Sequence, residues 1–233
     1  MPQQPPQVPE QSGRMADGSW DLPGRLRQDV LSSWKRSLLA GLTPERFEVP
    51  YVTDVDEDGP VAWTAAPVMA RLAQELEGTG IGILLADSRG HIISRRSGER
   101  HVLRLLDKIE LTPGSLYDED HIGTNAIGTA VALARPSVVA GPEHFADALG
   151  TMACAASPVT DAGGQVIGVL DLTCAARDFN PLMLPLVKHA AAEITAELAA
   201  HAILPKASAK CSGPATTDGR ACTTAVPMAL VPI

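Results

Sequence analysis

One acidic side chain interrupts an otherwise apolar stretch in the last third of the chain. Asp171 lies between the run Val166-Ile-Gly-Val-Leu170 and Leu172, and the composition of this run is typical of a buried strand. A buried carboxylate must be paired or hydrogen-bonded, or its pKa rises until the group is neutral. Two interpretations follow. Either Asp171 accepts hydrogen bonds from the backbone N–H groups of a neighbouring loop, or it faces a bound ligand.

The cysteines are the candidate nucleophiles and metal ligands, at Cys154, Cys174, Cys211 and Cys222. No two of them have CxxC spacing and none has a partner at zinc-finger spacing, so we expect no metal site and no disulfide framework. Cys154 and Cys174 flank a predicted hairpin, and we expect them to come within a residue or two of each other across it. Redox chemistry would need cations that stabilise a thiolate. Because the neighbouring residues are small or apolar, the pattern favours ordinary buried thiols.

The segment Gly123–Thr129, Gly-Thr-Asn-Ala-Ile-Gly-Thr, has the glycine spacing of a phosphate-binding loop. Thr129 stands where the motif requires lysine, and no strong strand precedes the segment. We therefore predict that it does not bind a nucleotide. Gly128 is expected to allow a helix to pack closely against the sheet.

The segment Asp54–Gly59, an Asp-x-Asp-x-Asp-Gly sequence, matches the first half of a calcium loop. The twelfth position should be a bidentate glutamate and is Ala65, so we interpret the segment as a solvated acidic linker. No Ser–His–Asp arrangement and no pair of carboxylates at catalytic spacing stands out elsewhere. The sequence therefore predicts no catalytic residue, no cofactor and no metal site.

Charge and hydropathy narrow the class of protein. The 233 residues carry a formal net charge of -8, which argues against a nucleic-acid-binding domain with a basic face. The N-terminal residues lack the charged start and apolar run of a signal peptide. The longest candidate membrane segment, Leu182–Leu204, is interrupted by Pro185, Lys188, Glu193 and Glu197. We expect a cytoplasmic protein that does not enter a membrane.

The spacing of apolar residues predicts an α+β fold. Helices are expected over 25–42, 66–76, 99–109, 122–134 and 181–203, and strands over 80–86, 91–94, 137–140, 153–160 and 165–173. The last two strands are joined by Asp161-Ala-Gly-Gly164, which is the clearest hairpin turn in the chain. Since hairpins make antiparallel neighbours, we expect an antiparallel sheet covered by helices.

Six short motifs occur in order and together resemble a known family. They are Leu111-Thr-Pro-Gly114, Tyr117-Asp-Glu119, Gly123–Ala130, Gly141–Phe145, Cys154–Pro158 and Gly168–Leu172. This set resembles the sensory GAF domain of acetoin-catabolism-type activators of sigma-54 RNA polymerase. The segments Ser33–Ser37 and Ala65–Val68 resemble the lead-in of such regulators, and the resemblance covers about residues 25–203.

The resemblance implies a GAF-like antiparallel sheet with helices on one face and a ligand pocket on the other. It implies a module of a transcription regulator that senses a small-molecule metabolite and passes the signal through its C-terminal helix. The chain has no complete phosphate-loop motif and no candidate recognition helix, so we expect neither an ATPase domain nor direct binding of nucleic acid. Two alternatives stay open: a GAF-fold redox enzyme that uses its cysteines, and an interaction module without a ligand.

The resemblance also implies which side chains surround the pocket. The helix near 125–134, the loop at 141–145 and the last strand pair would enclose one cavity. The side chains placed to orient a small polar metabolite would be Tyr117, Asn125, His144, Ser157 and Asp171, with Phe145 as an apolar wall. A mostly apolar lining with a few convergent polar groups is what small-ligand sites require.

One apolar stripe runs along the predicted C-terminal helix. Its members are Met183, Val187, Ala190, Ile194 and Leu198. The stripe either pairs with a second copy of the chain, which would make a homodimer, or packs on the protein's own sheet. Both interpretations use the same periodicity.

The composition of the two ends predicts that they are dispensable for folding. Residues 1–24 are rich in proline and glutamine, and residues 204–233 contain no aromatic side chain, so neither segment buries much apolar surface alone. Limited proteolysis should leave a stable core close to residues 25–203. Unfolding of the core after removal of the last segment would contradict this prediction.

Overall fold

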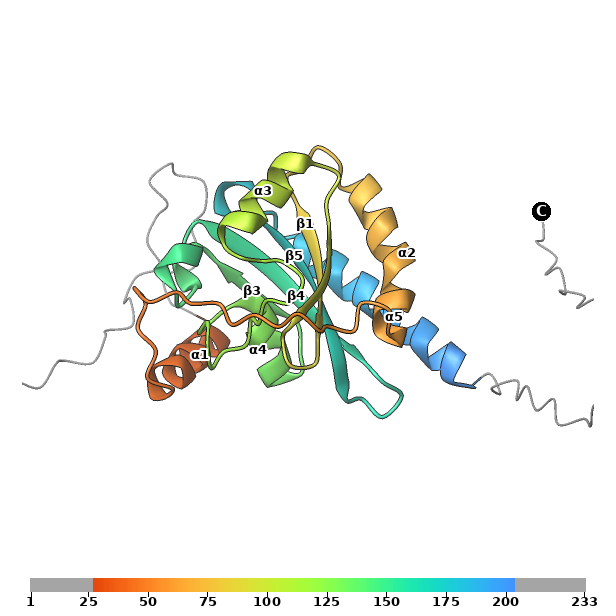
Figure 1. Ribbon diagram of the computed structural model, residues 1–233, viewed down its shortest axis with the longest axis horizontal. Helices are drawn as coiled ribbons and strands as arrows, with labels where there is room; N and C mark the ends of the chain where they lie inside the picture. Colours follow the sequence, from red (N-terminus) through yellow and green to blue (C-terminus); the bar gives the residue numbers. More distant parts are fainter. Residues whose placement is uncertain (1–26, 204–233) are drawn as a thin grey trace, which may run out of the picture. The chain divides into compact units, whose positions relative to one another are not determined.

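The computed structural model describes residues 27–203, and the predictions for the two ends lie outside this range. A five-stranded sheet has the order β2-β1-β5-β4-β3, and every neighbouring pair is antiparallel (Figure 1). The strands are β1 (Gly82–Asp87), β2 (Ile92–Arg96), β3 (Ser137–Ala140), β4 (Met152–Thr160) and β5 (Val166–Ala175). The predicted hairpin joins β4 to β5, and these two long strands lie at the interior of the sheet. The α+β class with an antiparallel sheet is therefore confirmed.

Five α-helices accompany the sheet within the described residues. They are α1 (Gln28–Leu39), α2 (Pro60–Glu75), α3 (Arg100–Lys108), α4 (Ala126–Leu133) and α5 (Met183–Ile203). The predicted start of α2 was wrong, because the helix already begins at Pro60 after Gly59 and therefore contains Pro67 in its interior. Proline is favoured at the first helical position, where its missing N–H has no helical partner to lose. The acidic segment Asp54–Gly59 is thus the approach to this helix.

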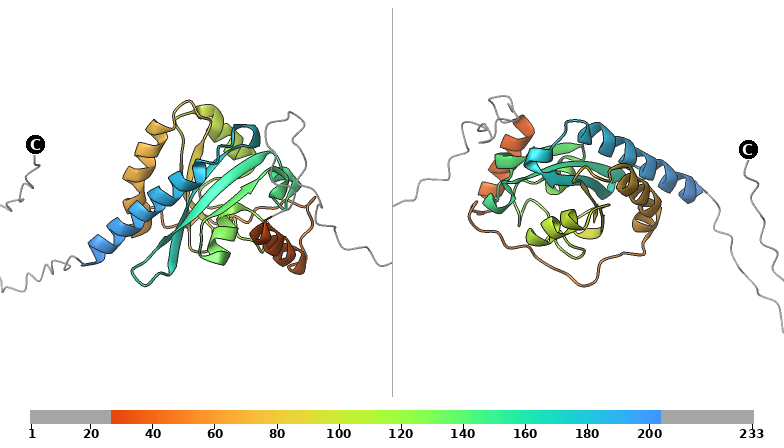
Figure 2. Two further views of the ribbon diagram at one scale, coloured as in Figure 1. Left: turned by 180° about the vertical axis from the view of Figure 1, so that it is seen from behind. Right: turned by 90° about the horizontal axis from the view of Figure 1, so that it is seen from above.

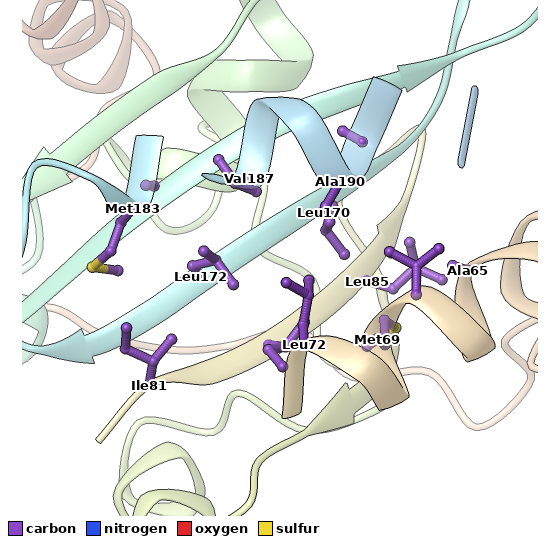
Figure 3. Close-up of a cluster of buried hydrophobic side chains, with 14 of the residues drawn as sticks. Ala65, Met69, Leu72, Ile81, Leu85, Leu170, Leu172, Met183, Val187 and Ala190 are labelled. Atoms are coloured by element: carbon purple, nitrogen blue, oxygen red, sulfur yellow. The ribbon is translucent and has the colours of Figure 1, made fainter. Parts of the chain in front are cut away.

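Helices α2 and α5 cover one face of the sheet and build the larger core with it (Figures 2 and 3). In Figure 3 the side chains of Met69 and Leu72 from α2 point toward Leu85 of β1. The stripe on α5 lies on the sheet: Met183, Val187, Ala190 and Ile194 are buried, and Leu198 is partly buried against the same core. Packing on the protein's own sheet therefore accounts for the stripe, and a homodimer would need a different surface.

The opposite face of the sheet is covered by α3, α4 and the segments that flank them, which form a second core. This face has helices as well as loops, whereas the prediction placed helices on one face only. Gly128 of α4 leaves no space for a Cβ atom, which would lie 2.9 Å from the Tyr117 carbonyl oxygen and 2.9 Å from the Glu119 nitrogen. The close approach that Gly128 allows is therefore to the backbone of this loop and not to the sheet.

Alternation along β5 separates the two cores. Leu170, Leu172 and Cys174 face α2 and α5, whereas Val169, Asp171 and Thr173 point to the other side. Because both faces are covered, the strand is apolar almost throughout, and Asp171 is buried inside the second core. Within residues 27–203, no helix is long and apolar enough to cross a membrane.

The packing of α5 generates a stability prediction. Ile194 is fully buried against the sheet, so Ile194→Ala should lower the free energy of unfolding by about 2–4 kcal/mol, through lost burial and a residual cavity. Leu182 is 69% exposed beside the same helix, and Leu182→Ala should change that free energy by less than about 0.5 kcal/mol. Urea denaturation measures both variants. Equal effects would contradict the assigned face of α5.

Candidate functional site

A small cavity lies between the sheet and the segments that cover its second face. Its wall is mostly apolar and includes a few polar side chains: Ile109, Leu111, Tyr117, Asn125, Ala126, Ile127, His144, Leu149, Met152, Cys154, Asp171 and Thr173. The centre of a water-sized molecule can occupy about 10 Å³ of it, which is close to the space that one water needs. Four of the predicted site residues meet here: Tyr117, Asn125, His144 and Asp171.

The buried carboxyl group of Asp171 has fewer hydrogen bonds with the described residues than it can form. Its side chain is 1% exposed, and the Thr173 hydroxyl donates a hydrogen bond to Oδ2. Oδ1 is buried and has no hydrogen-bond partner among the described residues. Burial raises the pKa of Asp171 to about 7, although the hydrogen bond from Thr173 acts in the opposite direction. No backbone N–H donates to this carboxyl group in the described structure, so the geometry favours the interpretation in which Asp171 faces a ligand.

Thr173 links Asp171 to a cysteine. Its Oγ1 lies 3.3 Å from the Sγ of Cys154 as well as within hydrogen-bond reach of Asp171. A threonine hydroxyl has one proton to donate, so it donates to the carboxylate when Asp171 is ionised and is free to donate to the sulfur when Asp171 is protonated. Burial, with a smaller effect of the Asp171 charge, raises the pKa of the Cys154 thiol well above its ordinary value. This thiol is therefore neutral at physiological pH.

Cys154 and Cys174 lie one residue apart across the β4–β5 ladder, with their side chains on opposite faces. Cys154 is opposite Thr173 in the β4–β5 ladder, and Cys174 is opposite Ala153. Adjacent positions of a strand point to opposite faces, so Cys154 lines the cavity while Cys174 lies beside Met183 under α5. Burial raises the pKa of Cys174 to about 12. The expected approach within a residue or two across the hairpin is met by the register, but the two side chains lie on opposite faces of the sheet.

His144 is held as a neutral imidazole. Its Nδ1 lies 3.0 Å from the carbonyl oxygen of Gly141, and the side chain is 3% exposed. Burial lowers the pKa of His144 to about 4, despite the opposing effect of the hydrogen bond to Gly141. In the neutral tautomer that donates from Nδ1, the Nε2 atom keeps its lone pair as an acceptor.

Tyr117 and Asn125 use their polar atoms within the fold. The Tyr117 hydroxyl donates to the carbonyl oxygen of Ile109, and burial raises the pKa of this phenol well above its ordinary value. Asn125 caps the N-terminus of α4: its Oδ1 accepts from the Gly128 N–H at 2.9 Å, and its Nδ2 donates to the Gly123 carbonyl at 2.9 Å. Both residues therefore shape the wall.

The other two predicted site residues lie elsewhere. Phe145 packs edge-on against Trp34 of α1 with ring centroids 5.0 Å apart, and it is not part of the cavity wall. Ser157 lines a surface groove with Lys188 and Thr195 of α5. Ala156 is opposite Asp171 in the ladder, so its neighbour Ser157 points to the other face of the sheet.

The cavity also includes polar residues that the sequence analysis did not select. Thr173 follows Asp171 by two positions, and the period of a strand could have placed it on the same face. Cys154 is predicted from the sequence as an ordinary buried thiol and not as part of the pocket. Outside the cavity wall, the buried carboxylate of Glu119 binds Arg36 of α1, and no local signal in the sequence indicates this long-range pair.

The fold and the site are those of a GAF-like sensory domain. The domain has an antiparallel sheet and a small, mostly apolar cavity whose wall contains a few polar side chains. The chain belongs to the family described as MimR, N-terminal domain, whose model matches residues 15–196. The propane 2-monooxygenase operon transcriptional activator MimR of Mycolicibacterium smegmatis is 39% identical over 173 residues, which are 74% of this chain and 30% of that protein. The resemblance to regulators of transcription is thereby confirmed.

A second relative is the acetoin dehydrogenase operon transcriptional activator AcoR of Bacillus subtilis. It is 31% identical over 191 residues, which are 79% of this chain and 31% of that protein. The chain thus spans about three tenths of the length of these relatives. A solved structure, the E. coli DhaR(N)-DhaL complex, matches with a TM-score of 0.72 and 20% identity over 76% of this chain and 63% of that chain. This likeness supports the fold.

The raised pKa of Asp171 predicts a pH-dependent effect of Asp171→Asn on stability. The stabilisation associated with the raised pKa is complete below pH 3.8, the ordinary pKa, and is lost as the pH rises through about 7. The asparagine variant should therefore gain stability relative to the wild type between pH 4 and pH 8, by on the order of 4 kcal/mol. Urea denaturation at the two pH values measures this gain.

Asp147→Asn, at an exposed position, is the control and should follow the wild type at both pH values. A variant Asp171→Asn that is less stable than the wild type at pH 8 would show that the ionised carboxylate stabilises the fold.

Proposed function

We propose that this chain is the effector-binding module of a transcriptional activator, and that the cavity takes a small uncharged metabolite. The observation that carries the proposal is Asp171 Oδ1, a buried oxygen without a partner on the wall of a mostly apolar cavity. A polar group of the ligand would satisfy this oxygen. Membership of a family of activator N-terminal domains supports the sensory role and a cytoplasmic location.

The chemistry of the wall favours an uncharged ligand with one or two polar atoms. An ionised ligand would lose its hydration in a cavity whose only charged group among the described lining residues is Asp171. Near its pKa of about 7, Asp171 accepts from a hydroxyl when ionised and donates to a carbonyl when protonated. Alcohols and ketones both satisfy this requirement.

The names of two relatives point to small uncharged molecules, of which acetoin also carries the hydroxyl and carbonyl groups that Asp171 could bind. Two of them are activators of operons for propane 2-monooxygenase and for acetoin dehydrogenase. Propane and acetoin are uncharged molecules with few carbon atoms. We infer that this chain responds to a compound of similar size.

Binding without turnover agrees with the state of the side chains in the wall. Burial keeps the Cys154 thiol protonated, and His144 binds the Gly141 carbonyl through Nδ1 instead of activating the thiol. Covalent catalysis needs a nucleophile beside a base, and the lining residues do not offer that arrangement. The cysteine-dependent redox enzyme is therefore disfavoured.

Thermal unfolding in the presence of small molecules tests the proposal. Acetoin and propan-2-ol should raise the melting temperature of the full chain, whereas propionate, a carboxylate of similar size, should not. Asp171→Asn should weaken binding of the uncharged probes about tenfold, because hydrogen bonds to ionised groups are roughly twice as strong as neutral ones. Isothermal titration at pH 8 measures the change.

Ser157→Ala is the matched control, since Ser157 faces α5 on the opposite side of the sheet, and it should leave the affinity unchanged. Equal losses in the two variants would remove Asp171 from the site. Failure of every uncharged probe to bind would favour the alternative of an interaction module without a ligand.

A further inference from the structure

Helix α1 holds the two residues on either side of His144 in the chain. The Nε1–H of Trp34 donates to the carbonyl oxygen of Glu143 at 2.8 Å, and the Trp34 ring packs edge-on against Phe145. Arg27, at the start of α1, donates to the Glu143 carboxylate at 3.0 Å. None of these α1 side chains belongs to the cavity wall. They nevertheless determine where the backbone around His144 lies.

The same helix also holds the second wall segment, which carries Tyr117 and Asn125. Glu119 lies between these two residues in the chain and is 7% exposed. Its Oε1 accepts from Ser33 at 2.6 Å and from Arg36 Nη2 at 2.8 Å, while Arg36 Nε donates to Oε2 at 2.5 Å. Burial alone would raise the pKa of Glu119, but the hydrogen bonds from Arg36, Ser33 and Thr129 outweigh it and lower that pKa below its usual range.

Thr124 connects the two wall segments beneath α1. Its Oγ1 lies 2.8 Å from Ser33 Oγ, which can accept a hydrogen bond from it, and its carbonyl accepts from the backbone N–H of Phe145 at 3.1 Å. In Figure 1 and the left view of Figure 2, α1 lies against the part of the fold that contains α4. One helix therefore contacts two of the segments that form the cavity wall opposite the sheet.

Because the cavity is small, a ligand larger than one water can enter it only if part of the wall moves. A metabolite of several heavy atoms needs far more space than the one-water volume between the walls. The sheet side of the cavity is formed by β4 and β5, each of which is paired with a strand on both edges. Opposite the sheet, the segments around Tyr117–Asn125 and Glu143–Phe145 form the wall together with residues 109–111, the start of α4 and Leu149. Outward movement of the two segments that contact α1 would widen the cavity and strain those contacts.

We propose that α1 is a clamp on the cavity and that Trp34 and Arg36 are positioning residues for its wall. The clamp proposal depends on the proposed function in one respect, which is that it takes the cavity to be the ligand site. Opening of the cavity and release of α1 are then one event, so a ligand that widens the cavity weakens the docking of α1. Linkage makes the effect reciprocal: loosening α1 favours the open cavity by the same factor.

Two cysteines on opposite faces of the sheet provide a readout that needs no knowledge of the ligand. Cys154 lines the cavity, and Cys174 is buried under α5. The rate at which a small neutral thiol reagent, methyl methanethiosulfonate, modifies Cys154 in the full chain reports opening of the cavity. Modification of Cys174 reports opening of the other core. Mass spectrometry of the proteolytic peptides distinguishes modification of Cys154 and Cys174 from modification of Cys211 and Cys222.

Trp34→Leu and Arg36→Met should each raise the rate of Cys154 modification by about fivefold or more, the lower end of typical coupling between linked sites. The rate for Cys174 should stay at the wild-type value. Arg71→Met is the matched control: it removes a two-pronged Arg–Glu pair with Glu193, at 2.8 and 2.6 Å, on the α2–α5 side of the sheet. This variant should leave the Cys154 rate unchanged.

Ser33→Ala removes one hydrogen bond to Glu119 and one to Thr124, and it serves as the milder variant if Trp34→Leu does not fold. An unchanged Cys154 rate in folded Ser33→Ala and Arg36→Met would overturn the clamp. A parallel rise at Cys154 and Cys174 would also overturn it, since that result indicates general destabilisation. Neither outcome depends on whether the uncharged probes bind, so the clamp and the proposed function fail separately.

Discussion

Burial of both faces of the sheet is the constraint on which the site depends. With α2 and α5 on one side and α3, α4 and their flanking segments on the other, most residues of β4 and β5 enter one core or the other. The side chains of Asp171 and Thr173 therefore project into the second core, where the carboxyl group has one hydrogen-bonded oxygen and one without a partner among the described residues. The raised pKa of Asp171 is a direct result of this placement.

The cavity has one rigid side and one adjustable side. Strands β4 and β5 are hydrogen-bonded along both edges, whereas the opposite wall consists of the start of α4 and of loop segments, two of which contact α1 through Glu119 and Glu143. A sensor needs both properties, because a fixed polar group selects the ligand and a movable wall reports its presence. In the proposed function Asp171 provides the first, and in the proposed clamp the docking of α1 provides the second.

The pKa values of two buried titratable groups in the wall are shifted in the direction that favours the neutral form of each group. The carboxyl group of Asp171 has a pKa of about 7 and His144 a pKa of about 4, both mainly because of burial. The environment thus disfavours ions of either sign.

Local patterns in the sequence determined the antiparallel sheet, the β4–β5 hairpin, most helices and the unusual position of Asp171, because periodicity and turn residues act between near neighbours. The six motifs, which occur in a fixed order along the chain, indicated the family. The sequence did not separate Ser157 from Asp171, since the two lie on different strands and only the register decides that they face opposite sides. Nor did it reveal that Phe145 supports α1, or that Glu119 binds Arg36 across 83 positions of the chain. Such contacts arise when distant segments pack together, and only the tertiary structure decides them.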